Sequence, residues 1–216
     1  DIEHLGAWLH ADASREQVMV SAEGLSSHWD KILAIMADVA QNAIFPDHEL
    51  ERVRNKQIAD LRRLSDDPVA VSHLASRAIL HGPDSQYGHP LNGTQISIEQ
   101  MTSEEIVGYF DSYYEPERAT LIAVGDIKGR QLIPKLHELF GGWKNRGLRA
   151  TEKHSDGTPL IEQTTIFLAD KPGATQSIIR AGHLMVPRYH DDYDALNLIN
   201  YIFGGQATSR LFMNLR

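Results

Sequence analysis

The chain contains no cysteine among its 216 residues. This absence excludes disulfide bonds, thiolate nucleophiles and cysteine-based zinc sites. Clusters of lysine and arginine are also missing, and the formal net charge is -8. Because neutralising phosphates requires such clusters, we expect no nucleic-acid partner. All apolar runs are short, and Leu121–Val124 is among the longest of them. No membrane span is therefore predicted.

Familiar catalytic patterns are equally scarce. There is no Gly-x-Ser-x-Gly elbow, and none of the eleven histidines stands four residues from another, the spacing that places two imidazoles on one helical face. Asp66 and Asp67 form a carboxylate pair, but they precede Pro68, which favours a helix cap over acid–base chemistry. The residue patterns alone therefore indicate no active site.

What the sequence does contain is a mixture of helix and strand signals. Helix starts are predicted at Ser27, at Asp67–Pro68 and at Thr102, where Glu105 completes a capping box. Residues 82–101 are predicted as a loop. Apolar and β-branched runs predict strands in four segments, namely 9–25, 119–126, 164–168 and 177–186. Because the helices cluster instead of alternating with strands, we expect an α+β fold.

A set of short motifs follows one another along most of the chain. They include the stretch Tyr87–Ile127, with Gly93-Thr94, Thr102–Glu105, Tyr114-Glu115-Pro116 and Val124-Gly125-Asp126, then Leu139–Trp143 and the closing "TSRLFMNLR". This series resembles the pitrilysin/insulinase family of zinc metallopeptidases, to which mitochondrial processing peptidase belongs.

The resemblance implies a fold and a domain plan. The expected fold is a two-layer sandwich, in which a mainly antiparallel sheet carries helices packed on one face. Residues 1–143 would be the C-terminal part of the first family domain, the polar segment 144–160 a linker, and residues 161–216 the N-terminal part of a second, similar domain. We expect the chain to be an excised piece, with the family's zinc-binding His-x-x-Glu-His segment before Asp1.

The same resemblance leaves two structural alternatives open. Residues 164–216 could complete the sheet of the first domain within one chain, or they could be exchanged between two chains.

Two residues of this chain correspond to functional positions of the family. Asp60 falls where the family has the glutamate that is the third zinc ligand, although aspartate is one methylene shorter. Without the resemblance, Asp60 is a solvated residue on a charged helix face. Arg216 matches an arginine that holds the substrate peptide and stabilises the developing oxyanion; without the resemblance it is a terminal helix residue.

These correspondences imply a zinc-dependent metalloendopeptidase that hydrolyses peptides or small proteins. The alternatives are a non-catalytic partner subunit, which binds substrate and an active subunit, and a structural scaffold. Expected partners are a peptide substrate and a second family subunit or a second copy in a homodimer, in the bacterial periplasm or cytoplasm.

A first prediction concerns the chain alone. It supplies at best one oxygen donor, whereas a zinc site needs three or four protein ligands, so we expect no stoichiometric zinc and no peptidase activity. Elemental analysis of the purified chain and a peptide-cleavage assay test this. One tightly bound zinc per chain, or cleavage that a chelator abolishes, would contradict it.

Overall fold

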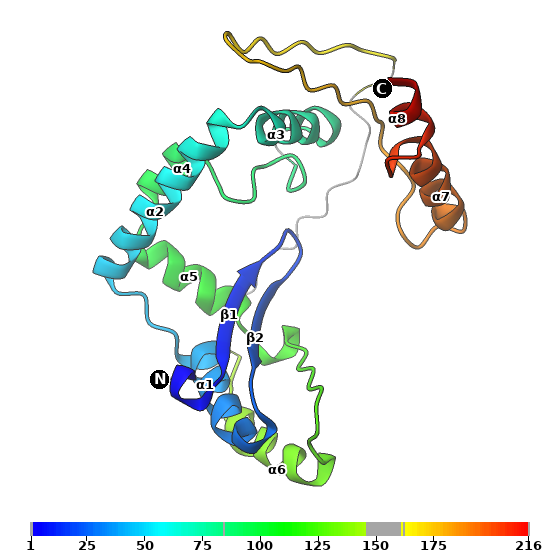
Figure 1. The fold of residues 1–216 in the computed structure, drawn as a ribbon. Helices are drawn as coiled ribbons and strands as arrows, with labels where there is room; N and C mark the ends of the chain where they lie inside the picture. The colour runs from blue at the N-terminus through cyan, green and yellow to red at the C-terminus, as the bar shows by residue number, and fades with distance from the viewer. Residues whose placement is uncertain (1, 84, 146–160, 162, 216) are drawn as a thin grey trace. The chain divides into compact units, whose positions relative to one another are not determined.

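The structure is a computed structural model that describes residues 2–83, 85–145, 161 and 163–215 (Figure 1). The chain divides into two compact units, residues 1–158 and 159–216. In the first unit the elements are η1 (Ile2–Leu5), β1 (Trp8–Ala13), β2 (Val18–Glu23), η2 (Ser26–His28), α1 (Trp29–Asn42), α2 (Asp47–Asp66), α3 (Pro68–His81), α4 (Gln95–Gln100), α5 (Ser103–Tyr113), η3 (Pro116–Arg118) and α6 (Gly129–Phe140). The second unit contains α7 (Tyr193–Gly204) and α8 (Arg210–Leu215).

The coarse α+β class is confirmed, because helices predominate and accompany a small antiparallel sheet. Within the described ranges this sheet has two strands, β1 and β2, paired from Trp8 opposite Glu23 to Ala13 opposite Val18. The predicted strand within 9–25 is thus a hairpin. Its turn is closed by Ser14, whose N–H donates to the carbonyl of Gln17 at 2.8 Å.

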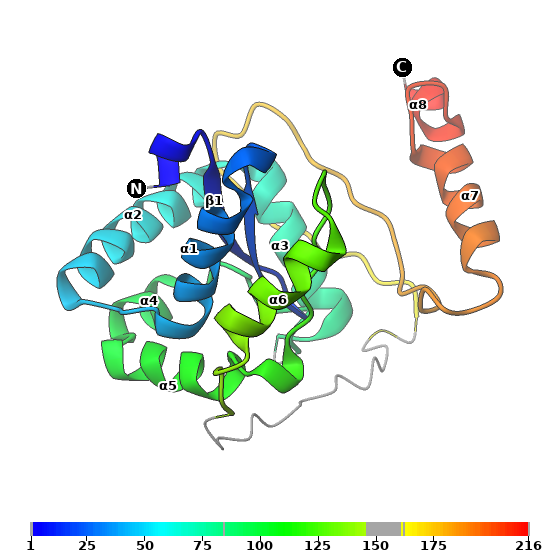
Figure 2. The same cartoon turned by 90° about the horizontal axis from the view of Figure 1, so that it is seen from below.

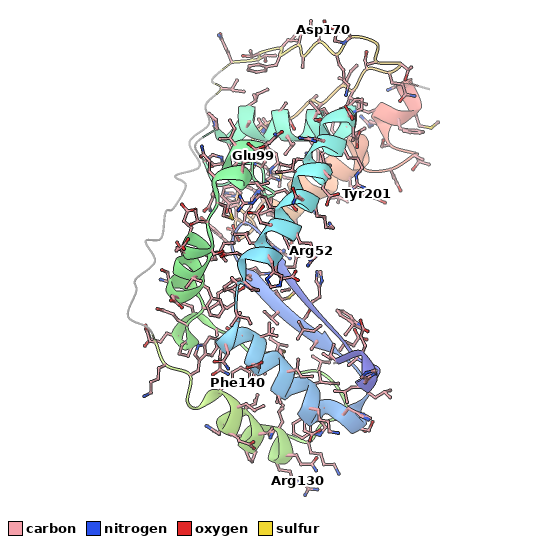
Figure 3. All side chains as sticks on the ribbon, turned by 90° about the vertical axis from the view of Figure 1, so that its left-hand side faces the viewer. Arg52, Glu99, Arg130, Phe140, Asp170 and Tyr201 are labelled. Atoms are coloured by element: carbon pink, nitrogen blue, oxygen red, sulfur yellow. The ribbon has the colours of Figure 1, made fainter. Side chains whose placement is uncertain are left out.

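Helix α1 packs against β2 and against α6, and Figure 2 shows α1 crossing the hairpin with α6 beside it. Figure 3 shows side chains of α1 and α6 between the two helices. Ile32 and Ala37 on α1 and Ala7 before β1 are buried. Gly24 allows this close approach, because a Cβ there would lie 2.6 Å from both Ala7 Cβ and Ile32 Cδ1.

Two of the three predicted helix starts are confirmed and one is wrong. The Asp67 carboxylate accepts a hydrogen bond from the Val69 N–H at 2.8 Å and caps α3. The capping box of Thr102 and Glu105 opens α5. The start at Ser27 is wrong, because Ser27 lies in η2 and α1 begins at Trp29 without a side-chain cap.

The segment 82–101 is not entirely a loop. It contains α4, which a second capping box opens between Thr94 and Ser97. A serine at the third helical position is a weaker signal than the glutamate of a standard capping box, and α4 has only six residues.

Three of the predicted strands are wrong. Residues 119–126, 164–168 and 177–186 form neither strand nor helix. A strand requires ladder hydrogen bonds to a neighbour, and none of the described residues provides them for these segments. Of the helices in the described ranges, none is long and apolar enough to cross a membrane.

The close contact at Gly24 gives a prediction for stability. Gly24→Ala forces the added methyl into Ala7 and Ile32 and should lower the free energy of unfolding by about 1–3 kcal/mol. Gly108→Ala is the matched control, because its Cβ would meet nothing within 4 Å inside α5 and should raise that free energy by up to about 1 kcal/mol. Urea denaturation measures both. Equal stability of Gly24→Ala and the unmodified chain would contradict the packing.

Candidate functional site

Asp60 lies on α2, a 20-residue helix whose surface is strongly charged. Opposite charges three or four residues apart face each other on a helix. One Asp60 oxygen, Oδ2, accepts a hydrogen bond from Lys56 Nζ at 2.8 Å, and the other, Oδ1, accepts one from Arg63 at 3.1 Å. Both carboxylate oxygens are therefore engaged by cations of the same helix.

These contacts affect the protonation of Asp60. The hydrogen bond from Lys56 is the main cause that lowers the pKa of Asp60 below its ordinary 3.8. Desolvation, the second cause, raises this pKa, and the charges of Lys56 and Arg63 lower it further. Asp60 is thus an anion at neutral pH. A divalent cation that binds it would have to displace or approach two positive side chains, which disfavours binding.

No other described residue near Asp60 completes a metal site with it. Among the described residues, no group of three or more histidine, cysteine, aspartate or glutamate side chains is placed to hold a metal ion. Asp60 alone, with its oxygens paired, does not fit the four-ligand geometry of zinc. The described residues on their own therefore do not form the zinc site of the family.

Arg216 lies outside the described residues. The helix that leads to it is present. Ser209 is buried, and its Oγ accepts a hydrogen bond from the Phe212 N–H at 3.4 Å at the start of α8.

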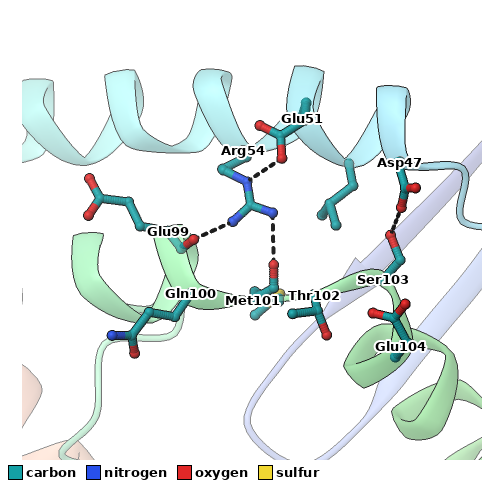
Figure 4. Close-up of a pocket in the computed structure, with 10 residues that line it drawn as sticks. Asp47, Glu51, Arg54, Glu99, Gln100, Met101, Thr102, Ser103 and Glu104 are labelled. Atoms are coloured by element: carbon teal, nitrogen blue, oxygen red, sulfur yellow. Dashed lines mark hydrogen bonds and ion pairs between the residues drawn. The ribbon is translucent and has the colours of Figure 1, made fainter.

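Sequence patterns did not reveal a second charged site, which surrounds Arg54 on α2 (Figure 4). The guanidinium donates to the carbonyl oxygens of Ile98 at 2.5 Å, Glu99 at 2.8 Å and Met101 at 2.8 Å. Its Nε forms an ion pair with Glu51 at 3.2 Å. The last carbonyls of a helix have no partners within it, so Arg54 caps α4 and fixes it to α2.

An open cavity of about 410 Å³ lies beside this cap. Its lining is mainly polar and acidic, and it consists of Asp47, Leu50, Glu51, Arg54, Glu99, Gln100, Met101, Thr102, Ser103 and Glu104. Ser103 Oγ donates to the Asp47 carboxylate across it. Since the polar contacts found there join α2 to α4 and α5, the arrangement is structural.

The family-like stretch that begins at Tyr87 is also fixed by long-range contacts. The Tyr87 hydroxyl donates to Glu16 in the hairpin turn, and this bond is the main cause that raises the pKa of Tyr87. Arg77 Nε donates to the Tyr87 carbonyl at 3.0 Å. The ring of His81 lies 5.4 Å from that of Tyr87, and burial followed by the charges of Arg77 and Arg15 lowers the pKa of His81.

This cluster joins α3 and its following loop to the β1–β2 turn. Arg15 in that turn also donates to the carbonyl of His89 at 3.1 Å. The His89 carbonyl thus holds the loop to the turn, and the His81 ring packs beside Tyr87 near two cations, so these contacts of both residues serve the fold.

Comparison with known families identifies both parts of the chain. Residues 1–88 match the family described as insulinase (peptidase family M16), and residues 100–216 match the peptidase M16 inactive domain. YmxG of Bacillus subtilis, described as an uncharacterized zinc protease, is 25% identical over 214 residues, which are 99% of this chain and 50% of YmxG. The mitochondrial-processing peptidase subunit beta of Neurospora crassa is 28% identical over 142 residues, 65% of this chain and 29% of that protein.

Solved structures agree on the fold. The peptidase M16 inactive domain from Pseudomonas fluorescens superimposes with a TM-score of 0.75 and 20% identity over 100% of this chain and 52% of that one. A protease from Helicobacter pylori gives 0.70 and 17% over 99% of this chain and 51% of its own. The chain thus spans about half the length of such relatives.

The geometry of Asp60 predicts a measurable titration. NMR should give Asp60 a pKa below 3.8, and Lys56→Met should raise it by removing the main stabilising hydrogen bond. Because folding lowers the pKa of Asp60, its ionised carboxylate stabilises the folded protein at pH values above its pKa in the unfolded chain. This stabilisation is lost as the pH falls through the pKa that Asp60 has in the folded protein. Arg52→Met is the matched control, since Arg52 pairs with Glu49 and not with Asp60. An unchanged Asp60 pKa in Lys56→Met would contradict the assignment.

Proposed function

Because this chain belongs to the M16, or insulinase, family of peptidases, we propose that the protein is a zinc-dependent metalloendopeptidase that hydrolyses peptides or small proteins. The observation that carries the proposal is the succession of two M16 domain matches, 1–88 and 100–216, along one chain. The zinc protease name of the Bacillus subtilis relative supports the same chemistry. A zinc ion in such enzymes lowers the pKa of its bound water and polarises the scissile carbonyl.

The contribution of this chain to that site is limited. We propose that Asp60 corresponds to the family's third zinc ligand and would contribute an oxygen only beside stronger donors from outside the described residues. For this to happen, its oxygens must leave Lys56 and Arg63. Arg216 is proposed as the substrate-binding arginine by its position in the motif.

A non-catalytic subunit is the second candidate, and the state of Asp60 favours it. The side chain is shorter than the glutamate of active members, and both its oxygens are neutralised by neighbouring cations. In this role the protein would bind substrate and complete an active subunit. The likeness to a mitochondrial-processing peptidase subunit beta supports a partner subunit in either role.

The finer features of the fold belong to the same proposal. We propose that the hairpin β1–β2 is part of a larger, mainly antiparallel sheet with helices on one face, and that 1–143 and 161–216 are parts of two similar domains. The proposed linker, 144–160, lies almost entirely outside the described residues. A bacterial periplasmic or cytoplasmic location stays a prediction.

The two candidates differ in their response to changes at Asp60. In the full-length gene product, a peptidase should cleave a fluorogenic peptide, lose this activity to a chelator and regain it with zinc. Asp60→Asn should then lower kcat/KM by about 100-fold. Glu49→Gln, another ion-paired carboxylate of α2, is the control and should leave activity unchanged.

A full-length protein without chelator-sensitive cleavage would contradict the peptidase proposal. If that protein nevertheless restored cleavage to an active family subunit, the non-catalytic role would stand. Normal activity of Asp60→Asn would remove Asp60 from the metal site.

A further inference from the structure

The loop that follows α3 is held together by its own backbone. The Gly82 N–H donates to the carbonyl of Ala78 at 2.9 Å, and the carbonyl of Ser85 accepts from Gly88 at 2.9 Å and from His89 at 3.0 Å. Gly82 and Gly88 are buried, and a Cβ at Gly88 would lie 1.8 Å from the Gly82 carbonyl oxygen. Because the loop has little internal freedom, its contacts with other elements decide where it lies.

Those contacts lead to the tip of the β1–β2 hairpin, which Figure 1 shows next to the loop. The Tyr87 hydroxyl donates to the Glu16 carboxylate, and Arg15 donates to the carbonyl of His89 at 3.1 Å. From α3, Arg77 Nε donates to the carbonyl of Tyr87 at 3.0 Å. The side chains that meet here, which we call the turn cluster, are Arg15 and Glu16 of the turn, Arg77 and His81 of α3, and Tyr87 of the loop.

The charges of the turn cluster are unevenly balanced. Arg15 and Arg77 are cations, and Glu16 is the one carboxylate among the five members. His81 follows Arg77 by four residues, so the two side chains share a face of α3. Its ring lies 5.4 Å from that of Tyr87, whose carbonyl holds Arg77. A proton on His81 would therefore add a third cation to the cluster, and like charges at this helical spacing are destabilising.

His81 is the member of the cluster whose charge can change in mild acid, because histidine is the side chain that ordinarily titrates between pH about 5 and about 8. Burial, followed by the charges of Arg77 and Arg15, lowers the pKa of His81 from its ordinary 6.5. The closed cluster therefore favours the neutral ring. Its stability is complete above the ordinary pKa and is lost as the pH falls from there towards the lowered one. The raised pKa of Tyr87 keeps its hydroxyl a donor throughout.

We propose that the turn cluster is a pH-sensitive latch, in which protonation of His81 in mild acid releases the loop after α3 from the tip of the hairpin. The bonds from Tyr87 to Glu16 and from Arg15 to His89 would break, whereas the backbone bonds within the loop would stay. The added charge raises the free energy of the closed form more than that of the open form, where water screens the three cations from one another. This inference does not depend on the proposed peptidase activity.

Amide hydrogen exchange of the full-length gene product, followed by mass spectrometry, tests the release. After correction for the intrinsic effect of pH, peptides with the hairpin turn and with Tyr87 should lose protection between pH about 8 and about 5. Peptides of α1 should keep theirs, because only the latch opens. Unchanged protection of the turn, or an equal loss in α1, would overturn the proposal, since the second result means general unfolding.

Variants of His81 show whether this side chain is responsible. His81→Phe keeps an aromatic ring beside Tyr87 but takes up no proton, so the protection of the turn should no longer depend on pH. His81→Gln makes the same test without a ring. His89→Gln is the matched control, because His89 contacts the turn through its carbonyl, and it should keep the pH response. A response that persists in both His81 variants, or that disappears in His89→Gln, would contradict the latch.

Discussion

The pairing of backbone N–H and C=O groups is the constraint on which this structure depends. An unpaired buried backbone group costs about as much as a lost hydrogen bond. The helices α1 to α6 satisfy this requirement internally, and they account for the parts of the first unit that are well packed. The strand-type segments cannot do so, because a strand bonds only to a neighbour. Segments 119–124 and 164–168 therefore remain outside the sheet with their apolar side chains exposed.

Contacts between distant residues compensate for the small sheet. The hydrogen bonds of Arg54 reach carbonyls 44 to 47 residues away and hold α4 to α2. The bond between Tyr87 and Glu16 spans 71 residues and fixes the hairpin turn. Both are charge-assisted, and such bonds are stronger than those between neutral groups. They explain how short elements such as α4 keep a defined place without a large apolar core.

The sequence predicts this structure well where the cause is local. Asp67 and the Thr102–Glu105 box are recognisable because their partners lie two or three residues away. The strand at 119–126 was wrongly predicted because its apolar pattern is right for a strand, but whether a neighbour exists cannot be read from the segment itself. Arg54 was missed for the related reason that its three acceptors are backbone atoms of another helix. The resemblance alone assigns Asp60 to the third-ligand position, whereas its pairing with Lys56 and Arg63 follows from spacing and could have been predicted.

The same constraint connects the family assignment with the unpaired segments. The chain corresponds to about half of its M16 relatives, and Asp60, proposed as the counterpart of the family's third zinc ligand, is already paired with two cations. The most direct test is amide hydrogen exchange of residues 119–126. The account predicts almost unprotected amides in dilute solution, because no described residue pairs with this segment. Strong protection that is independent of concentration would contradict it, because the segment would then already be paired within one chain.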